Sequence, residues 1–243
     1  MERGNEMRLD KLLSECQLAT RSEAAKVCRS GLVTVNGAVA KKSDIHVDPE
    51  HDSICFRGEL VEYRKFVYIM LNKPDGYISA TEDGKDPVVT ELLPLKYQKM
   101  GLFPCGRLDK HTLGLMLLTN DGALSHRLLA PKNHVTKSYG FSVKHPLSAS
   151  DISTLEAGVD IGDYVTKPCR VKINAPTEGV ISITEGKYHQ IKRMMEAVEN
   201  RITALERLTF GPLQLDEDLP RGAWRMLTDE EQTELIRATQ KSE

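Results

Sequence analysis

The segment from residue 106 to residue 119 has residue types that could do chemistry. It reads GRLDKHTLG over residues 106–114, with a glycine at each end, and LMLLT over residues 115–119, which is apolar enough for a buried strand. The polar turn would fix Asp109 beside Arg107 at the edge of a sheet. A carboxylate held in this way can act as a nucleophile or as a base. It can equally be a turn residue that hydrogen-bonds its own backbone, with Arg107 a solvated charge, and the residues alone leave both interpretations open.

The sequence lacks the motifs of common cofactor-dependent sites. It contains no glycine-rich nucleotide loop of either common spacing, no histidine pair on one helical turn, and no nucleophilic serine elbow. Its cysteines are odd in number and scattered, which fits neither a disulfide framework nor a zinc site: Cys16, Cys28, Cys55, Cys105 and Cys169. We therefore expect reduced, mostly buried thiols and a chemistry that needs no metal and no other cofactor.

Positive charge is segregated along the chain, although the formal net charge is only -2. Residues 7–42 contain seven Lys or Arg against three acids, and residues 126–145 contain four against none. From residue 216 onward the balance reverses to eight acids against four bases. Local basic surface is what a phosphate backbone requires, although either patch alone is equally consistent with an ordinary solvated face.

The length of 243 residues exceeds the usual size of one compact unit, which predicts a small module followed by a larger domain. No apolar run approaches the roughly 20 residues needed to cross a bilayer. Residues 1–6 also lack the apolar segment of a secretion signal. We therefore expect a cytoplasmic protein with no membrane contact.

The first 61 residues predict two short helices packed against a small, bent sheet. Leucines at positions 9, 12 and 13 recur at helical spacing, and Thr20 with Glu23 forms a capping box for a second helix that Gly31 ends. The dipeptide Asn36-Gly37 lies between two β-prone segments and predicts a tight hairpin, with a further strand at residues 53–57.

This order of elements resembles the RNA-binding module named after ribosomal protein S4, over roughly residues 7–60. The resemblance is carried by RLDKLL at residues 8–13, SEA at 22–24 and GLVTVNG at 31–37. It implies that the helix pair and the start of the sheet present basic side chains to structured RNA. The candidate phosphate contacts are Arg8, Lys11, Arg21, Lys26 and Arg29.

A charged linker at residues 62–65 precedes a second domain, residues 66–243. An apolar run at residues 66–71 predicts a buried strand closed by Asn72-Lys73-Pro74. Further strands are expected at residues 114–119, 137–144, 170–174, 180–184 and 202–209, and helices at 122–129, 150–156, 189–198 and 229–239. Because several strands follow one another without a crossover helix, we expect an α+β domain with a mixed, mainly antiparallel sheet.

The segment from Gly106 matches the signature GRLDxxTxGL of the RsuA family of pseudouridine synthases, and the chain resembles this family over its whole length. The match continues through NKP at 72–74, KSY at 137–139, EGKYHQIKRM at 185–194 and residues 211–215. Ser138 stands where threonine is more usual, and His111 occupies a variable position. The resemblance implies the pseudouridine synthase fold and a reaction that breaks the N1–C1′ bond of a uridine, turns the base and rejoins it through C5.

The resemblance also implies three catalytic residues. Asp109 is the essential carboxylate, which either attacks or shields C1′ or acts as a base. Lys192, where many relatives carry arginine, is the cation that orients Asp109 and keeps it ionised among RNA phosphates. Tyr139 is the platform on which the target uracil stacks once it has left its own stack.

Further side chains are expected to contact the substrate. Arg107 would hold the phosphate of the flipped nucleotide or keep the vacated space open, and Arg193 and His189 lie beside Lys192 in the sequence. A basic track would continue along Arg127, Lys132, His134 and Lys137.

The run from Lys187 to Lys192 resembles the small-subunit branch of the family more than the large-subunit branches. We therefore expect a monomeric enzyme that modifies 16S rRNA, either as naked RNA or in a small-subunit assembly intermediate. The rival functions are a large-subunit rRNA synthase, a non-catalytic rRNA-binding assembly factor, and a glycosidase that leaves an abasic site. The intact set of Asp109, Tyr139 and Lys192 argues against the binding factor.

Overall fold

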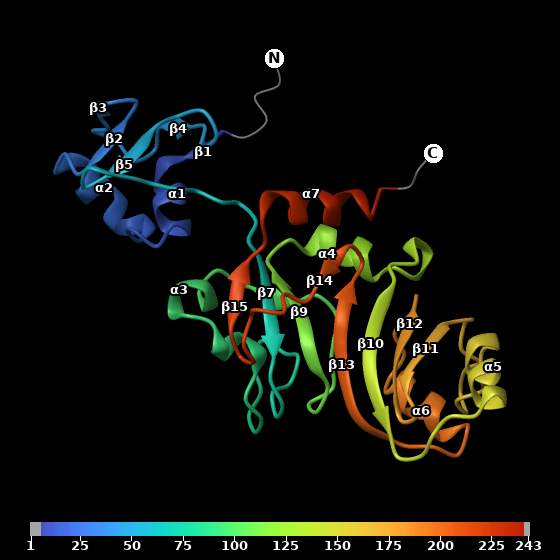
Figure 1. The fold of residues 1–243 in the computed structure, drawn as a ribbon. Helices are drawn as coiled ribbons and strands as arrows, with labels where there is room; N and C mark the ends of the chain where they lie inside the picture. The colour runs from blue at the N-terminus through green and yellow to red at the C-terminus, as the bar shows by residue number, and fades with distance from the viewer. Residues whose placement is uncertain (1–5, 241–243) are drawn as a thin grey trace. The chain divides into compact units, whose positions relative to one another are not determined.

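The computed structural model describes residues 6–240 and forms two compact units, one ending at Lys65 and the other beginning at Phe66 (Figure 1). Residues 1–5 lie outside the described part, so most of the segment examined for a secretion signal does too. Within residues 6–240, no helix has the length and apolar character that a membrane crossing requires.

The first unit packs two helices onto a four-stranded antiparallel sheet of order β3-β2-β5-β6, and β1 pairs separately with β4. The capping box of Thr20 and Glu23 is confirmed, and Asn36 and Gly37 both have positive φ, as a tight hairpin turn needs. Helical spacing buries three leucines of α1 completely against α2. The elements are β1 (Met7–Arg8), α1 (Leu9–Glu15), α2 (Arg21–Arg29), β2 (Val33–Val35), β3 (Ala38–Val39), β4 (His46–Val47), β5 (Ile54–Phe56) and β6 (Glu59–Leu60).

The second unit is built on one mixed sheet whose main path runs β11-β12-β10-β13-β9-β7-β15 (Figure 1). Among the described strands, only β9 and β13 pair in parallel, so the α+β prediction with a mixed, mainly antiparallel sheet is confirmed. The strands are β7 (Tyr68–Lys73), β8 (Phe103–Pro104), β9 (Leu113–Thr119), β10 (Lys137–Val143), β11 (Arg170–Ala175), β12 (Glu178–Ile183), β13 (Ile202–Phe210), β14 (Leu213–Gln214) and β15 (Trp224–Met226).

Helices cover both faces of this sheet, so its central strands are buried on each side. On β7, Ile69 packs into one cluster with Met194 of α6, whereas Met70 packs into a second cluster with Leu128 of α4. Because successive side chains of a strand point to opposite faces, residues of β7 pack into both cores, and neither face of the strand is exposed to solvent. The helices are η1 (Val89–Leu92), α3 (Leu95–Gln98), α4 (Gly122–Leu129), η2 (Pro131–Asn133), α5 (Ala149–Ala157), α6 (Gln190–Glu196) and α7 (Asp229–Arg237).

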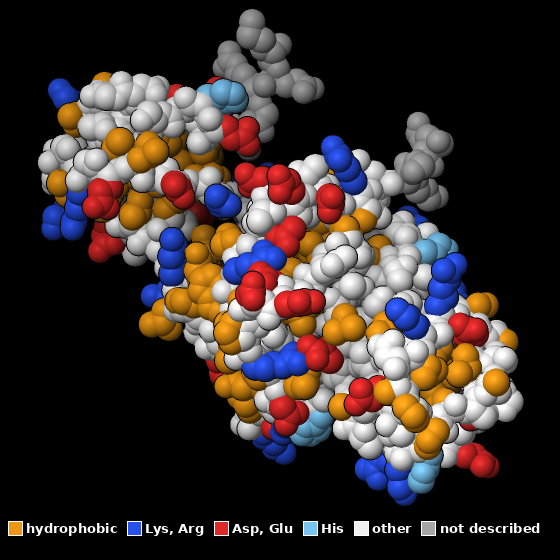
Figure 2. All heavy atoms as spheres, viewed as in Figure 1, with side chains coloured by type: hydrophobic (Ala, Val, Ile, Leu, Met, Phe, Trp, Pro, Cys, Tyr) orange, Lys and Arg blue, Asp and Glu red, His pale blue; other side chains and the backbone are white. Residues whose placement is uncertain are grey.

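Two predicted elements have different bounds for local reasons. The strand expected at residues 66–71 begins at Tyr68, because the Val67 N–H bonds the Asn120 side chain instead of a neighbouring strand, and it continues through Asn72 and Lys73. The helix expected at 189–198 begins at Gln190, since His189 takes a left-handed φ of 49°, and it ends at Glu196. The acidic excess near the C-terminus gathers over α7 (Figure 2).

The parallel pairing of β9 with β13 brings the Asp109 turn beside the middle of β13. Gly114 pairs with Arg207, and a Cβ at position 114 would lie 2.3 Å from the Arg207 carbonyl oxygen. Gly114 also has a φ of 94°, so this position requires glycine on two grounds. The glycine that ends the sequence motif is thus the residue that allows the two strands to meet.

Candidate active site

The turn that carries Asp109 is fixed on both sides. The Leu108 amide donates to Ser79 Oγ at 2.9 Å, and the Ser79 hydroxyl donates back to the Leu108 carbonyl at 2.8 Å. On the other side, the Thr112 amide donates to the Asp109 carbonyl at 3.0 Å. The backbone of Asp109 is therefore held by contacts on either flank, which orients its side chain before any substrate binds.

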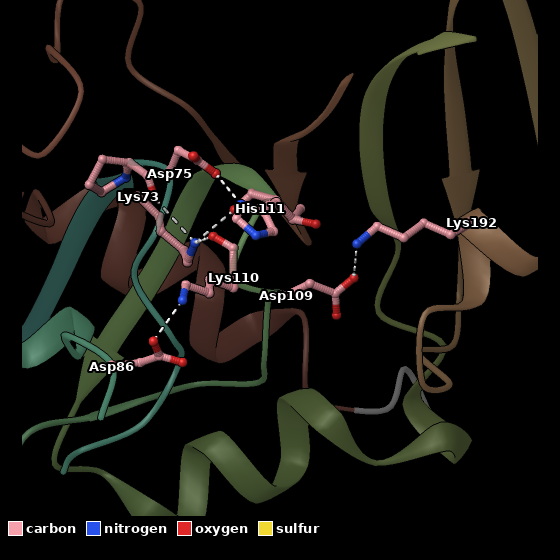
Figure 3. A network of polar contacts seen from close by, with 9 residues as sticks. Lys73, Asp75, Asp86, Asp109, Lys110, His111 and Lys192 are labelled. Atoms are coloured by element: carbon pink, nitrogen blue, oxygen red, sulfur yellow. Dashed lines mark hydrogen bonds and ion pairs between the residues drawn. The ribbon is translucent and has the colours of Figure 1, made fainter. Parts of the chain in front are cut away.

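A buried ammonium group completes this support. Lys73 Nζ donates to the carbonyls of Pro74, Lys110 and Thr112 at 3.2, 3.0 and 2.9 Å, and its side chain is fully buried (Figure 3). Burial lowers the pKa of Lys73 to about 8, while the charges of Asp75 and Asp109 act in the opposite direction. Two of these three carbonyls belong to Lys110 and Thr112, which follow Asp109 in the turn.

The side chains of Asp109 and Lys192 point toward one another from separate parts of the fold (Figure 3). Lys192 Nζ donates to Asp109 Oδ2 at 2.7 Å from the first turn of α6, and His189 Nε2 lies 3.5 Å from Oδ1. Each of Asp109 and Lys192 keeps 28% of its side chain exposed. The carboxylate is thus oriented by a charge-assisted hydrogen bond and remains accessible.

These residues line one pocket of about 1040 Å³, which is at the upper end of the range for small-molecule sites. Asp109, Lys192, His189, Tyr139 and Arg107 all contribute to its wall. The wall contains seven Lys or Arg against three acids, so it favours an anionic ligand. The basic residues are Arg107, Lys110, Lys137, Lys167, Lys187, Lys192 and Arg207.

Tyr139 of β10 lines the pocket, but only a small part of its surface is exposed there. Its residue exposure is 8%, and most of it belongs to the core cluster that also contains Phe141 and Ile181. A ring fixed in this way presents a rigid surface to the pocket and loses no freedom when a ligand arrives.

Two other cations of the pocket wall are buried rather than solvated. Lys137, which we expected in a basic track beside the site, lines the pocket but is only 8% exposed, and it donates to the Val135 carbonyl at 3.0 Å. Burial lowers the pKa of Lys137 to about 8. Arg207 is 1% exposed, donates to the Leu115 carbonyl at 2.6 Å, and lies 5.1 Å from the Phe210 ring.

Sequence reasoning missed Arg207, Lys73 and Glu185 as members of this site. Glu185 is 7% exposed and accepts hydrogen bonds from the Tyr164 hydroxyl, the Lys167 amide and the Gln190 side chain at 2.8, 3.0 and 2.7 Å. It therefore joins the 160–167 loop to the start of α6. For Lys73 the available signal was a charge at the end of a largely apolar strand, whereas Glu185 follows a strand and Arg207 lies beside Glu206 within one, so neither position indicated burial.

Several residues that we expected to contact the substrate lie outside the pocket wall. Arg193 does not line the pocket, because its guanidinium binds Asp163 and the Ile161 carbonyl. Arg127 is exposed on α4 and donates to Thr239 Oγ1 at 3.3 Å, and Lys132 and His134 follow it outside the pocket wall. Arg127, Lys132 and His134 are all exposed, and the basic track expected along them stays a prediction.

The five basic candidates of the first unit are all exposed. Arg8 pairs with Asp10 at 2.6 Å, and Lys11 lies 3.7 Å from Glu15. Arg21, Lys26 and Arg29 belong to α2. In the described part of the chain, no three His, Cys, Asp or Glu side chains converge as they would around a metal ion.

Comparisons with known proteins place this geometry in a family. The model of the RNA pseudouridylate synthase family matches residues 67–197, and the model of the S4 domain matches residues 7–53. A Bacillus subtilis (strain 168) protein named "Uncharacterized RNA pseudouridine synthase YtzG" is 47% identical, with 93% of this chain and 96% of that protein aligned. "Ribosomal small subunit pseudouridine synthase A" of Yersinia pestis is 40% identical over the same shares of the two chains.

A solved structure agrees with these relatives. It is described as "Crystal structure of pseudouridylate synthase", is 35% identical and superposes with a TM-score of 0.67, covering 94% of this chain and 99% of its own. The family model alone spans more than half of the chain. The chain therefore belongs to the RNA pseudouridylate synthase family, whose members are isomerases.

Proposed function

We propose that the protein is an rRNA pseudouridine synthase whose target uridine lies in 16S rRNA. The observation that carries the proposal is the ion pair of Asp109 with Lys192, 2.7 Å apart, inside a basic pocket large enough for a nucleotide. The 16S assignment is supported by relatives named for the small ribosomal subunit, of which the Yersinia pestis protein is one.

In this proposal the target uridine leaves its stack and enters the pocket, where the Asp109 carboxylate meets its ribose. The N1–C1′ bond breaks, the uracil turns, and C5 forms the new bond to C1′. The proton on C5 is then lost to a base or to water, and N1 takes up a proton, so the product is an isomer of the substrate. Asp109 acts either by attack at C1′ or by removing a proton from the sugar.

The surrounding residues have supporting roles. Lys192 orients the carboxylate, and Tyr139 offers the flipped uracil a rigid ring surface, which offsets part of the cost of unstacking. The buried charges of Arg207 and Lys137 favour the negative charge that develops on uracil when the N1–C1′ bond breaks. Arg107, which is exposed at the pocket wall, is placed to contact a phosphate.

The two units divide the work in this proposal. Residues 1–61 form an RNA-binding domain, residues 62–65 a linker, and residues 66–243 the isomerase domain. Arg8, Lys11, Arg21, Lys26 and Arg29 of the first unit hold folded rRNA or a small-subunit assembly intermediate. We propose that the protein acts as a monomer in the cytoplasm.

The proposal is tested by release of tritium from C5-labelled uridine in rRNA transcripts and assembly intermediates, followed by carbodiimide mapping of 16S and 23S rRNA. One modified position in 16S rRNA would support the assignment. A position in 23S rRNA would move the target to the large subunit. Binding without release on either substrate would indicate an assembly factor, and chain scission at one uridine would indicate a glycosidase.

A further inference from the structure

The most exposed aromatic ring at the pocket is not used by the proposed reaction. Tyr188 is 72% exposed, yet it belongs to the wall of the pocket that contains Asp109. Its ring stacks on that of His189 with centroids 3.9 Å apart and an interplanar angle of 17°. His189 in turn lies 3.5 Å from the Asp109 carboxylate. One face of Tyr188 is therefore covered by His189, and its exposure leaves the other face for a ligand.

The backbone around Tyr188 is held in an uncommon conformation that presents the ring. His189 has a left-handed φ of 49°, which costs free energy for a residue other than glycine. The turn is closed by two hydrogen bonds between Lys187 and Gln190, from the Lys187 amide to Oε1 at 2.9 Å and from the Gln190 amide to the Lys187 carbonyl at 3.1 Å. Gln190 is itself anchored by the buried Glu185. The position of the ring is thus set by buried contacts.

Cations share the pocket wall with Tyr188. Lys187, its neighbour in the chain, has its ammonium 4.2 Å from the centroid of the Tyr164 ring, and Lys167 and Lys192 line the same pocket. An exposed aromatic ring beside fixed positive charges is the combination with which proteins bind single-stranded nucleic acid, through base stacking and phosphate contacts.

We propose that Tyr188 and Lys187 form a second nucleotide subsite, in which Tyr188 stacks on the base next to the flipped uridine and Lys187 contacts the adjoining phosphate. The subsite rests on the proposed function, because it needs an RNA strand that enters the pocket at its target uridine. It would make the enzyme sensitive to the neighbour of the target and not only to the target itself.

The test measures single-turnover rates over a range of RNA concentrations, with an rRNA transcript or assembly intermediate that the wild-type protein modifies. Tyr188→Ala should raise the half-saturating RNA concentration roughly 5- to 150-fold, the range that stacking of one base on an aromatic ring produces. The maximal rate should stay near that of the wild type, and Tyr188→Phe should restore the half-saturating concentration. Leu95→Ala removes an exposed apolar side chain outside the pocket and should change neither quantity.

A second measurement reports stacking directly. With 2-aminopurine placed on either side of the target uridine, binding of the wild-type protein or Tyr188→Phe should quench the fluorescence at one of the two positions, and Tyr188→Ala should not. An unchanged half-saturating concentration for Tyr188→Ala overturns the subsite. A loss confined to the maximal rate also overturns it, because Tyr188 would then act through His189 on Asp109. Failure of the proposed function is distinguishable, since the wild-type protein would then form no pseudouridine at all.

Discussion

The buried cations around the candidate site and the exposed cations of the first unit are held in different ways. Lys73, Lys137 and Arg207 are buried in the second unit, and each donates hydrogen bonds to backbone carbonyls. Arg21, Lys26 and Arg29 of α2 are exposed. The first group has fixed positions and is little screened by salt, whereas the second group attracts phosphates through a screened, sequence-independent field.

This difference assigns separate tasks to charges of the same sign. Buried cations shape a site around one carboxylate, so their loss should affect structure and the chemical step. Exposed cations should affect RNA affinity and its salt dependence while leaving the chemical step intact.

The largest effect is expected for Asp109→Asn. Because the amide can neither attack C1′ nor accept a proton, tritium release should fall at least about 10³-fold. RNA affinity measured by filter binding should stay close to that of the wild type. Asp86→Asn is the matched control, since Asp86 pairs with Lys110 at 2.6 Å in the same region without touching Asp109, and it should keep most of the activity. Substantial activity in Asp109→Asn would remove Asp109 from the mechanism.

The second effect concerns Lys73, which supports the Asp109 turn. Lys73→Met leaves the carbonyls of Pro74, Lys110 and Thr112 without their donor, and we expect the free energy of unfolding to fall by about 2–4 kcal/mol. Urea denaturation measures this change, and tritium release should fall as well because the turn relaxes. Lys110→Met, at a side chain that is 40% exposed in the same turn, should cost less than about 1 kcal/mol. Equal costs for the two variants would contradict the contrast between buried and exposed cations.

The third effect concerns the exposed cations of α2. Lys26→Ala combined with Arg29→Ala removes two candidate phosphate contacts, so the slope of log affinity against log salt should become shallower by roughly 1.5. The maximal single-turnover rate should not change. The control is Lys99→Ala with Lys172→Ala, which removes the same charge from exposed positions of the second unit outside the pocket. A salt slope that changes equally in both double variants would show that only total charge matters.

Sequence patterns predicted the long elements well because their periodicity is local. The helix at residues 122–129 has the expected bounds, and the strands expected at 137–144 and 202–209 each differ by one residue at one end. The segments η1, α3, β8 and β15 contain only two to four residues each and were not predicted. Such short elements depend on the partners that tertiary packing supplies, so they leave little pattern in the sequence.

For the candidate site, the resemblance to the family predicted Asp109, Tyr139 and Lys192, and the fold places all three in one pocket. Arg207 was not predicted, because a charged residue within a strand is normally expected on the solvent side. The register of β10 with β13 skips Leu208, and this irregularity coincides with burial of both Arg207 and Phe210. The burial of Arg207 is thus a property of the pairing of two strands and is not encoded in either one.

The smallest effect is expected when a partly buried cation outside the pocket, Arg225 of β15, loses its charged partner Glu231. It donates to both carboxylate oxygens of Glu231 at 2.7 and 2.8 Å and to Asp216 at 2.7 Å, which ties β15 to the first turn of α7. The hydrogen bonds from Arg225 lower the pKa of Glu231 below its usual value of 4.5. Glu231→Gln should therefore cost about 1–2 kcal/mol of unfolding free energy at neutral pH and leave tritium release unchanged.

The pH dependence of that cost identifies its source. A carboxyl group with a lowered folded pKa stabilises the fold above its unfolded pKa, and this stabilisation is lost as the pH falls through the folded value. The difference in unfolding free energy between the wild type and Glu231→Gln should thus be constant above pH 4.5 or so and shrink below it. Glu230→Gln, at an exposed neighbour in the same turn, should show a much smaller difference. A cost that persists unchanged in acid would mean that packing, and not the charge of Arg225, holds α7 to β15.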